Sequence, residues 1–417
     1  MLIEGVRVRP GTKMAPGVAS DRDWLCGGRR TPHTNYMLDV EVGRYDRNIA
    51  RALCIASAWA YSDIGTFAGM MDCKGWMRGN QTVKLQVTNA EFFLRTTAYL
   101  TQSSDKKLLI LAFRGSELRD VTTWLSDASV RMDPFRSAGY VHGGFYRATL
   151  VLWPTLKVLL DHANRGGSIC DAAMAVKSMT QRCTEEAPRG SAGGQPWADT
   201  GEAPPLEEAR APDALRVPRQ PALLDEAQPL EEARAPDRPR LRVESPAGNG
   251  SSELKGLFIT GHSMGGALAV LTAALIHATP ELKLQPKLRA IYTFGQPMVG
   301  DEDFAHRFEK DIGNKLKRHV HGLDVVPRLP PRSAGRFTPL GEEYSSSEAG
   351  WVYRSRPVSQ VYTFLGSTVL GLLHFLQQQL AGIPILRRIP FPFSWDHHGL
   401  QHYLRTSVEV PPGAELE

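Results

Sequence analysis

Residues 257–270 constrain the fold of this chain more than any other stretch. An apolar run, Leu-Phe-Ile-Thr, breaks into Gly261-His262-Ser263-Met264-Gly265 and continues in residues rich in Ala and Leu. The run has the length and composition of a buried strand, and the segment after it is typical of a helix packed on a sheet. A Gly-x-Ser-x-Gly spacing between a strand and a helix predicts a nucleophile elbow with Ser263 at the turn.

An elbow of this kind explains the two glycines. The serine backbone is strained, and its neighbours must approach each other without side chains. The serine hydroxyl then stands at a helix N-terminus, where backbone N–H groups and the helix dipole favour developing negative charge. A chance Gly-x-Ser-x-Gly in a loop is the alternative, and the strand before and the helix after favour the elbow.

Composition excludes several other classes of function. The chain has 417 residues, of which 42% are hydrophobic and 22% charged, which is ordinary for a globular protein with a sizeable core. A net charge of +5 gives no strong electrostatic case for nucleic acid. Neither His-Glu-x-x-His nor a Lys-Ser/Thr phosphate loop occurs, so we expect no metal and no cofactor.

The cysteines and the N-terminus bear on location. The five cysteines are widely spaced and form no Cys-x-x-Cys pair, which fits a reducing compartment, although one disulfide remains open. The first residues lack the apolar run of a secretory signal. We therefore expect a cytoplasmic protein, with membrane association left open.

Periodicity predicts the domain organisation. Residues 1–40 are rich in Gly, Pro, Arg and Asp without periodicity and are expected to form a poorly ordered arm. Residues 41–417 are expected to form one domain, in which strands and helices alternate as in a mainly parallel sheet with helices on both faces. The clearest elements predicted are a helix at 47–61, strands at 107–113, 288–294 and 316–321, and a helix from 145 to 160.

A change of composition interrupts this domain. Residues 166–252 are dense in Pro, Ala, Glu and Arg, and one nonapeptide, Pro-Leu-Glu-Glu-Ala-Arg-Ala-Pro-Asp, occurs at 205–213 and again at 229–237. Two copies are too few for a solenoid, which usually needs at least about three. We expect a long disordered insert, with a docking site for a protein partner as the functional alternative.

A second unusual segment is the apolar run at residues 361–386. Its strictly apolar part is shorter than the about 20 residues that a membrane-spanning helix needs. The sequence leaves open a hairpin or interfacial helix near the active site and an ordinary buried helix.

Several blocks of sequence occur in an order that resembles one family. Phe-Arg-Gly-Ser at 113–116, His-Gly-Gly-Phe at 142–145, the elbow, Thr-Phe-Gly-Gln-Pro-Met-Val-Gly at 293–300 and Asp-Val-Val-Pro-Arg-Leu-Pro at 324–330 resemble the class 3, fungal-type lipases. The resemblance covers about residues 45–165 and 253–405. It implies the α/β-hydrolase fold and hydrolysis of lipid esters.

A serine nucleophile needs a base within hydrogen-bond reach and an acid that orients the base. In α/β-hydrolases these follow the serine in the order Asp or Glu, then His. Asp324 follows a predicted strand and begins the block that resembles the family's acid loop. His398 keeps the family's five-residue spacing to Tyr403, whereas His397 keeps the Asp-His dipeptide, so we favour His398 with His397 as the register alternative. His402 is expected on a helix face.

An oxyanion hole is also expected. Elbow geometry assigns the backbone N–H of Met264 as one donor. The resemblance implies Ser116 as the second donor and a lid over residues 117–128, whose many charges argue against strong interfacial activation.

The sequence therefore predicts a serine esterase of the triacylglycerol lipase type that forms an acyl-enzyme at Ser263. Its expected partner is a lipid or acyl-ester substrate, with peripheral contact to a lipid interface left open. The alternatives are a phospholipase A1, a short-chain carboxylesterase, and a catalytically silent hydrolase-like scaffold whose insert binds a partner.

Overall fold

The computed structural model describes residues 1–8, 34–72, 77–89, 94–115, 131–136, 138–185, 253–360 and 396–408. Most of the predicted insert, the apolar run at 361–386 and the predicted lid lie outside these residues. The chain divides into one unit of residues 1–179 and 243–417 and a second of residues 180–242. The fold described below is that of the first unit.

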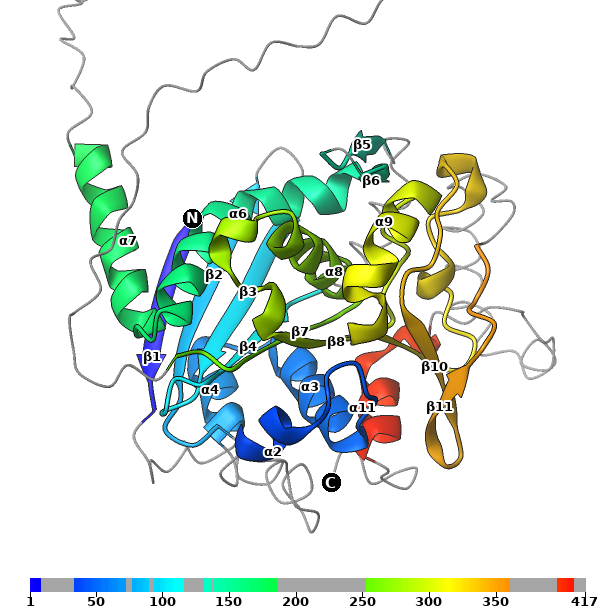
Figure 1. Ribbon diagram of the computed structural model, residues 1–417, viewed down its shortest axis with the longest axis horizontal. Helices are drawn as coiled ribbons and strands as arrows, with labels where there is room; N and C mark the ends of the chain where they lie inside the picture. Colours follow the sequence, from blue (N-terminus) through cyan, green and yellow to red (C-terminus); the bar gives the residue numbers. More distant parts are fainter. Residues whose placement is uncertain are drawn as a thin grey trace, which may run out of the picture. The chain divides into compact units, whose positions relative to one another are not determined.

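Nine strands of the described residues form one mixed sheet, in the order β1-β2-β3-β4-β7-β8-β9-β10-β11 (Figure 1). The central strands β4, β7, β8, β9 and β10 pair in parallel, and the strands on both flanks pair antiparallel. The strands of this sheet are β1 (Leu2–Arg7), β2 (Gln81–Asn89), β3 (Leu94–Gln102), β4 (Leu108–Phe113), β7 (Gly256–His262), β8 (Leu288–Phe294), β9 (Leu316–Val320), β10 (Glu342–Ser347) and β11 (Gly350–Arg354). A separate pair is formed by β5 (Met132–Pro134) and β6 (Tyr140–His142).

Helices cover both faces of the sheet (Figure 1). On one face lie α2 (Thr34–Asp39), α3 (Arg47–Trp59), α4 (Ile64–Asp72) and α11 (Leu400–Val408), and on the other lie α6 (Gly143–Asn164), α8 (Met264–His277) and α9 (Glu302–Ile312). The helix α7 (Ile169–Glu185) follows α6. This is the α/β architecture expected from the alternation of strands and helices, with a mainly parallel central sheet.

The strand β4 shows how the two layers of core arise. All six of its residues are buried. Leu109 and Leu111 pack with the side chains of α6 and α8, whereas Leu108 and Ile110 pack with those of α3 and α4. Successive side chains of a strand point to opposite faces, so a continuous apolar run marks a strand that is buried on both sides.

Register aligns the carboxyl ends of the parallel strands. Phe113 of β4 pairs with Gly261 of β7, His262 with Phe294 of β8, and Phe294 with His319 of β9. Loops that leave these strands therefore begin at one common edge of the sheet, which is where ligands bind in open α/β sheets.

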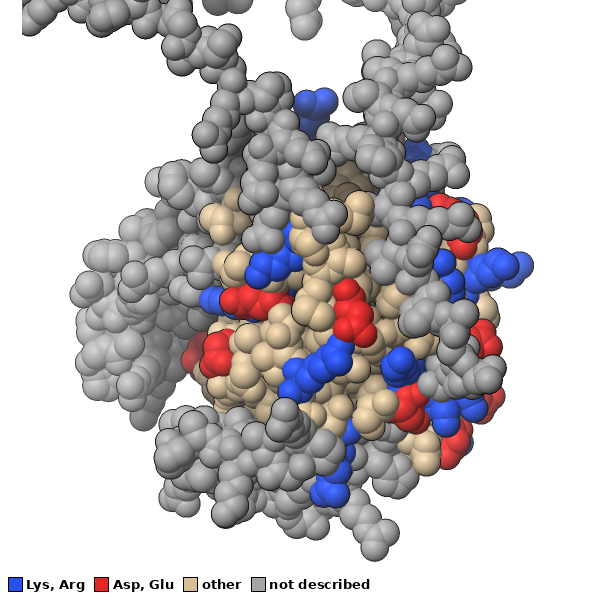
Figure 2. Space-filling view, turned by 90° about the vertical axis from the view of Figure 1, so that its left-hand side faces the viewer, with Lys and Arg blue, Asp and Glu red and all other residues tan. Residues whose placement is uncertain are grey.

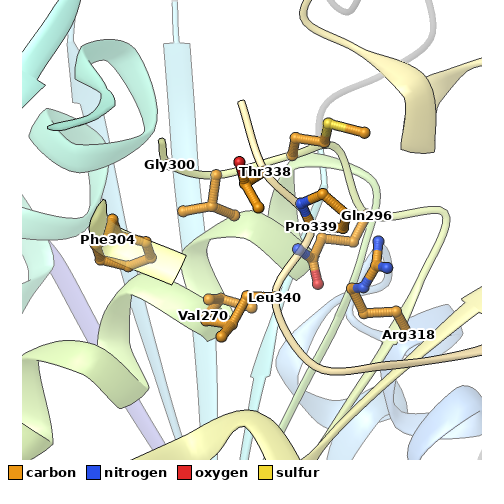
Figure 3. Close-up of a pocket in the computed structure, with 10 residues that line it drawn as sticks. Val270, Gln296, Gly300, Phe304, Arg318, Thr338, Pro339 and Leu340 are labelled. Carbon is orange, nitrogen blue, oxygen red and sulfur yellow. The ribbon is translucent and has the colours of Figure 1, made fainter. Parts of the chain in front are cut away.

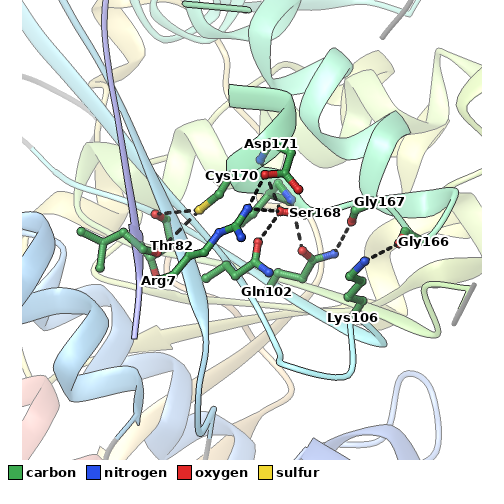
Figure 4. A network of polar contacts seen from close by, with 12 residues as sticks. Arg7, Thr82, Gln102, Lys106, Gly166, Gly167, Ser168, Cys170 and Asp171 are labelled. Atoms are coloured by element: carbon green, nitrogen blue, oxygen red, sulfur yellow. Dashed lines mark hydrogen bonds and ion pairs between the residues drawn. The ribbon is translucent and has the colours of Figure 1, made fainter. Parts of the chain in front are cut away.

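The N-terminus differs from the expected disordered arm. Leu2–Arg7 form β1, an edge strand that pairs with β2 along its whole length. The guanidinium of Arg7 also bonds the hydroxyl of Ser168 and the carboxylate of Asp171 at the start of α7 (Figure 4). The expectation was wrong for this segment because strand pairing and polar anchors of this kind leave little trace in six residues of sequence.

The predicted insert also begins too early. Residues 169–185, which fell inside it, form the 17-residue helix α7. Ile169, Ala172, Ala173 and Val176 are buried, and this i, i+3, i+4, i+7 spacing is that of an amphipathic helix. The side chain of Gln102 bonds the carbonyl of Gly167 and the N–H of Ile169, which fixes the start of the helix (Figure 4).

In the described residues, no helix is long and apolar enough to span a bilayer. On the face shown in Figure 2, Lys and Arg side chains lie beside Asp and Glu side chains, and the described part of this face carries no patch of a single sign.

Two buried histidines predict a pH dependence of stability. Burial lowers the pKa of His142 to about 4 and that of His319 to about 3, whereas an unfolded histidine titrates near 6.5. Below pH 6.5 the unfolded chain therefore binds protons that the folded chain does not. We expect these histidines not to reduce the free energy of unfolding above pH 6.5. As the pH drops toward 4, that free energy should fall by up to about 1.4 kcal/mol per pH unit for each histidine. Urea unfolding at pH 7.5, 6 and 5 measures this slope. His319→Gln should flatten it, and an unchanged slope in that variant would contradict the assignment.

Candidate active site

Ser263 occupies the turn between β7 and α8. Its backbone has φ 56° and ψ −132°, a region that non-glycine residues rarely adopt and that costs about 1–3 kcal/mol. The residue is fully buried, and its N–H donates to the carbonyl of Phe294 at 2.9 Å. The predicted elbow is therefore present, with the serine at the N-terminus of a 14-residue helix.

The glycines on either side of Ser263 are required by packing. A Cβ on Gly261 would lie 2.3 Å from the carbonyl carbon of Gly265, and a Cβ on Gly265 would lie 2.4 Å from the carbonyl oxygen of Phe113. Both contacts are to backbone, which cannot move aside as a side chain can. The turn can close only with glycine at these two positions.

Three side chains from distant parts of the chain meet at this turn. The Nε2 atom of His398 lies 2.9 Å from the Oγ atom of Ser263, and its Nδ1 atom lies 2.8 Å from the Oδ2 atom of Asp324. Each of the three residues is at most 1% exposed. The imidazole therefore bridges an alcohol and a carboxylate in a hydrogen-bonded chain shielded from water.

The loop after β9 positions Asp324. Its Oδ1 atom accepts the N–H of Val326 at 2.8 Å, which turns the carboxylate toward the imidazole. Its Oδ2 atom accepts the hydroxyl of Tyr403, a buried residue of α11, at 2.5 Å. The Tyr403 oxygen in turn accepts the N–H of His321 at 3.2 Å. The carboxylate is thus held by three donors, the N–H of Val326, the hydroxyl of Tyr403 and the Nδ1–H of His398. Burial and, to a lesser extent, Asp324 raise the pKa of the Tyr403 phenol.

The two candidate histidines have different surroundings. His398 ends the short 3₁₀ helix Asp396–His398 and points to Ser263. His397 points elsewhere, because its Nδ1 atom accepts the N–H of Leu323 at 2.9 Å and its ring lies beside His321. The geometry thus brings together Ser263, Asp324 and His398. The register alternative His397 takes no part in this hydrogen-bonded chain. His402 lies on α11 as expected.

Gly295 forms one wall of this arrangement. It follows β8 with φ +60°. A Cβ at this position would lie 2.9 Å from the Nδ1 and Cε1 atoms of His398 and 3.0 Å from the Oδ2 atom of Asp324. The Thr-Phe-Gly-Gln-Pro block therefore brings its glycine directly against the imidazole and the carboxylate.

The predicted oxyanion donors are only partly within the described residues. Met264 is the first residue of α8, directly after the serine. Ser116 and the predicted lid lie outside the described residues. Gly115, which precedes Ser116, approaches the elbow so closely that a Cβ there would lie 3.1 Å from the Cβ of Ser263. The loop after β4 thus reaches Ser263.

A second histidine, His262, also contacts the hydrogen-bonded chain of Ser263, His398 and Asp324. His262 stacks on His398, with ring centroids 4.7 Å apart, and bonds its backbone carbonyl. Tyr61, at the end of the α3 segment, bonds the other nitrogen of His262. No signal in the sequence links Tyr61 to the elbow, because the contact joins residues about 200 positions apart.

Among the described residues, neither a metal-binding cluster nor the cavity in Figure 3 belongs to the site at Ser263. No cluster of three or more His, Cys, Asp or Glu suited to a metal occurs in the part of the chain that is described. The cavity in Figure 3 has a volume of about 10 Å³, which is room for roughly one water molecule. It is lined by residues such as Val270, Gln296 and Arg318, not by the three residues of the hydrogen-bonded chain, so it is no substrate site.

A buried serine, imidazole and carboxylate at a strand-turn-helix elbow, on the carboxyl edge of a mainly parallel sheet, define an α/β-hydrolase. Comparison with known proteins shows similarity to lipases. The family model described as "Lipase (class 3)" matches residues 251–334. A lipase of Rhizopus oryzae is 40% identical over 91 residues, 22% of this chain and 23% of its own length. A tobacco (Nicotiana tabacum) protein named triacylglycerol lipase OBL1 is 26% identical over 243 residues, 54% of this chain and 38% of its own length.

Among solved structures, lipase II from Rhizopus niveus is similar over 78% of this chain and 89% of its own, with 18% identity and a TM-score of 0.43. The chain spans less than half the length of both sequence relatives. The chain is therefore similar to class 3 lipases over residues 251–334, and both sequence relatives are named lipases.

Substitution of Gly295 by alanine tests the packing of the site. The new methyl group would press on His398 and Asp324, and the positive φ adds strain of about 1–2 kcal/mol. We expect the rate at which a fluorophosphonate reacts with Ser263 to fall about 100-fold, since misplacement by about 1 Å has this effect.

Gly5→Ala is the matched control, because a Cβ there meets only the Sγ atom of Cys170 at an ordinary 3.5 Å. The control should react like the unaltered protein. Equal rates for Gly295→Ala and Gly5→Ala would contradict the site geometry.

The hydroxyl of Tyr403 provides a second test. Tyr403→Phe removes one donor to Asp324 and leaves the N–H of His321 without that acceptor. A buried group left unsatisfied costs about 1–3 kcal/mol, so the urea midpoint should fall and the labelling rate should drop by about 10-fold. Tyr353→Phe removes a hydroxyl from a tyrosine that is 56% exposed and should change neither. A Tyr403→Phe protein that is as stable and as reactive as Tyr353→Phe would argue against the contact.

Proposed function

We propose that this protein hydrolyses carboxylic esters of lipids, as a triacylglycerol lipase does, through an acyl-enzyme on Ser263. The observation that carries the proposal is the hydrogen-bonded chain from the Oγ atom of Ser263 through His398 to Asp324. A serine hydroxyl is a poor nucleophile at neutral pH, and this chain supplies the base and the acid that it lacks.

The first half of the reaction follows from the geometry. The Nε2 atom of His398 takes the proton from the Oγ atom of Ser263 as that oxygen attacks the ester carbonyl carbon. Asp324 accepts the Nδ1–H of the imidazole and stabilises the imidazolium that forms. The N–H of Met264, at the start of α8, is proposed to bind the oxyanion together with Ser116.

The second half restores the site. The tetrahedral intermediate collapses, the bond from the carbonyl carbon to the alcohol oxygen breaks, and His398 gives its proton to the departing alcohol. Water then attacks the acyl-Ser263 carbonyl, and His398 again takes the proton. The bond from the carbonyl carbon to the Oγ atom of Ser263 breaks, His398 returns the proton to Oγ, and the fatty acid leaves. Atoms and charge balance with one water consumed for each ester cleaved.

Sequence similarity supports the substrate class. The family model that matches residues 251–334 is described as a class 3 lipase, and the name of the tobacco relative specifies triacylglycerol. An acylglycerol ester is therefore the first substrate to test. Phospholipase A1 activity and short-chain carboxylesterase activity use the same chemistry and are distinct outcomes of that test. Contact with a lipid interface, a partner for the insert and a cytoplasmic location stay predictions.

The experiment compares the unaltered protein with Ser263→Ala on mono-, di- and triacylglycerols of short and long chains, on a phospholipid, and on a soluble acetyl ester. We expect hydrolysis of the acylglycerols with long chains and a loss of about 10⁶-fold in kcat for Ser263→Ala. Removal of one hydroxyl from the strained turn should leave the fold intact, which near-UV circular dichroism would check.

Ser57→Ala is the control, because Ser57 is equally buried and lies outside the hydrogen-bonded chain at the elbow. It should keep full activity per folded molecule. Cleavage of only the phospholipid or only the acetyl ester would replace the proposed substrate class. Folded protein that cleaves none of them would favour the silent scaffold.

A further inference from the structure

A second imidazole is built into the elbow beside the proposed base. His262, the last residue of β7, is 5% exposed and immediately precedes Ser263. Its ring stacks on that of His398 at 30°, with the centroids 4.7 Å apart. Its Nε2 atom lies 3.0 Å from the backbone carbonyl oxygen of His398, and its Nδ1 atom lies 3.1 Å from the hydroxyl oxygen of Tyr61.

These two partners fix the protonation of His262. A carbonyl oxygen can only accept, so Nε2 must carry the proton. Nδ1 then has a lone pair and accepts the O–H of Tyr61. The side chain is therefore a neutral imidazole with both nitrogens bonded, and burial lowers its pKa well below the usual value, with the neighbouring His398 as a smaller cause.

A neutral His262 ring is compatible with a positive charge on the neighbouring His398. During the proposed reaction His398 becomes an imidazolium, and a second cation stacked on it in a buried site would oppose that charge. A neutral ring that donates through Nε2–H can hold the backbone of His398 without repelling its side chain.

The contact matters because of where His398 stands. It closes a 3₁₀ helix of three residues, before the nine-residue α11, and so belongs to a short segment. The hydrogen bond from His262 joins the backbone of that segment directly to the end of β7, the strand that immediately precedes Ser263. A general base has to stay within about 2.6–3.2 Å of the heavy atom whose proton it takes. A hydrogen bond that ties the segment of the base to that of the nucleophile helps to maintain this distance.

Tyr61 connects His262 to a third segment, the loop after β4. The guanidinium carbon of Arg114 lies 5.4 Å from the centre of the Tyr61 ring, and a Cβ on Gly115 would lie 2.3 Å from the Tyr61 hydroxyl. Arg114 and Gly115 form the start of the loop after β4, which approaches Ser263. The pair Tyr61 and His262 thus touches the segment that leads into Ser263, the segment of His398 and the loop after β4.

We propose that His262, held by Tyr61, is a positioning residue that keeps His398 at bonding distance from Ser263 through its bond to the His398 backbone carbonyl. The inference rests on the proposed function for its kinetic readout, since it assigns no chemistry to His262 itself.

The test compares two substitutions at one position in the full-length protein. His262→Phe keeps an aromatic ring and removes both hydrogen bonds, whereas His262→Gln places an amide Nε2–H near the position of the imidazole Nε2–H. We expect His262→Phe to lower kcat by about 10- to 100-fold with KM within about twofold, and fluorophosphonate labelling to slow equally. His262→Gln should recover most of both rates.

His319 supplies the matched control. It is also a buried imidazole that stacks on an aromatic ring and bonds the backbone carbonyl of Thr293. Its ring contacts are not with Ser263, His398 or Asp324. His319→Phe and His319→Gln should alter the urea midpoint and leave kcat per folded molecule unchanged. If His262→Phe behaves like His319→Phe, the proposal is overturned. Equal losses in His262→Phe and His262→Gln would also overturn it, because the donor would then be irrelevant.

A readout independent of activity separates this proposal from the proposed function. In ¹⁵N-labelled protein, the Nδ1–H proton that His398 shares with Asp324 should exchange slowly with water. That protection should be lost in His262→Phe and kept in His262→Gln, whether or not the protein cleaves any ester tested. Protection that persists in His262→Phe would refute the tie. Should His262→Phe fail to fold, Tyr61→Phe removes only the supporting hydroxyl, and it should show the same loss of protection in weaker form; full protection there would count against the proposal.

Discussion

The strained backbone of Ser263 is the feature on which the rest of the structure depends. A φ of 56° in a residue with a side chain is unfavourable, and the surrounding fold must hold it. The strand β7 pairs with a neighbour on each side, and nearly all of α8 is buried. Between them, glycine at 261 and 265 lets three stretches of backbone come within contact. The two-layer core is therefore what keeps the hydroxyl at a helix N-terminus.

Burial sets the character of the polar chain at this turn. Within a protein interior, hydrogen bonds are stronger and unpaired polar groups are more costly than in water. Asp324 is fully buried, yet His398, Tyr403 and the N–H of Val326 all donate to it. His262 likewise has a partner at each nitrogen. A site in which these groups satisfy one another is rigid, and this rigidity is what places a base beside a nucleophile before substrate arrives.

The sequence predicted the elements that local patterns encode. The strands at 288–294 and 316–320 and the elbow carry their signals in a few adjacent residues, and the spacing from His398 to Tyr403 separated the two candidate histidines. Features that depend on distant partners escaped it. The pairing of β1 and the contact of Tyr61 with the elbow each join residues that are far apart in the chain, where periodicity gives no information. The helix α7 does carry a helical pattern, but it lies inside the segment that composition assigned to the insert.

The central claim is that one serine, activated by one histidine, forms a covalent acyl intermediate. Peptide mapping by mass spectrometry after reaction of the full-length protein with a long-chain alkyl phosphonate tests it most directly. We expect a single adduct on the peptide that contains Ser263. An adduct at another residue, or hydrolysis of lipid esters by protein whose Ser263 peptide stays unmodified, would contradict the account.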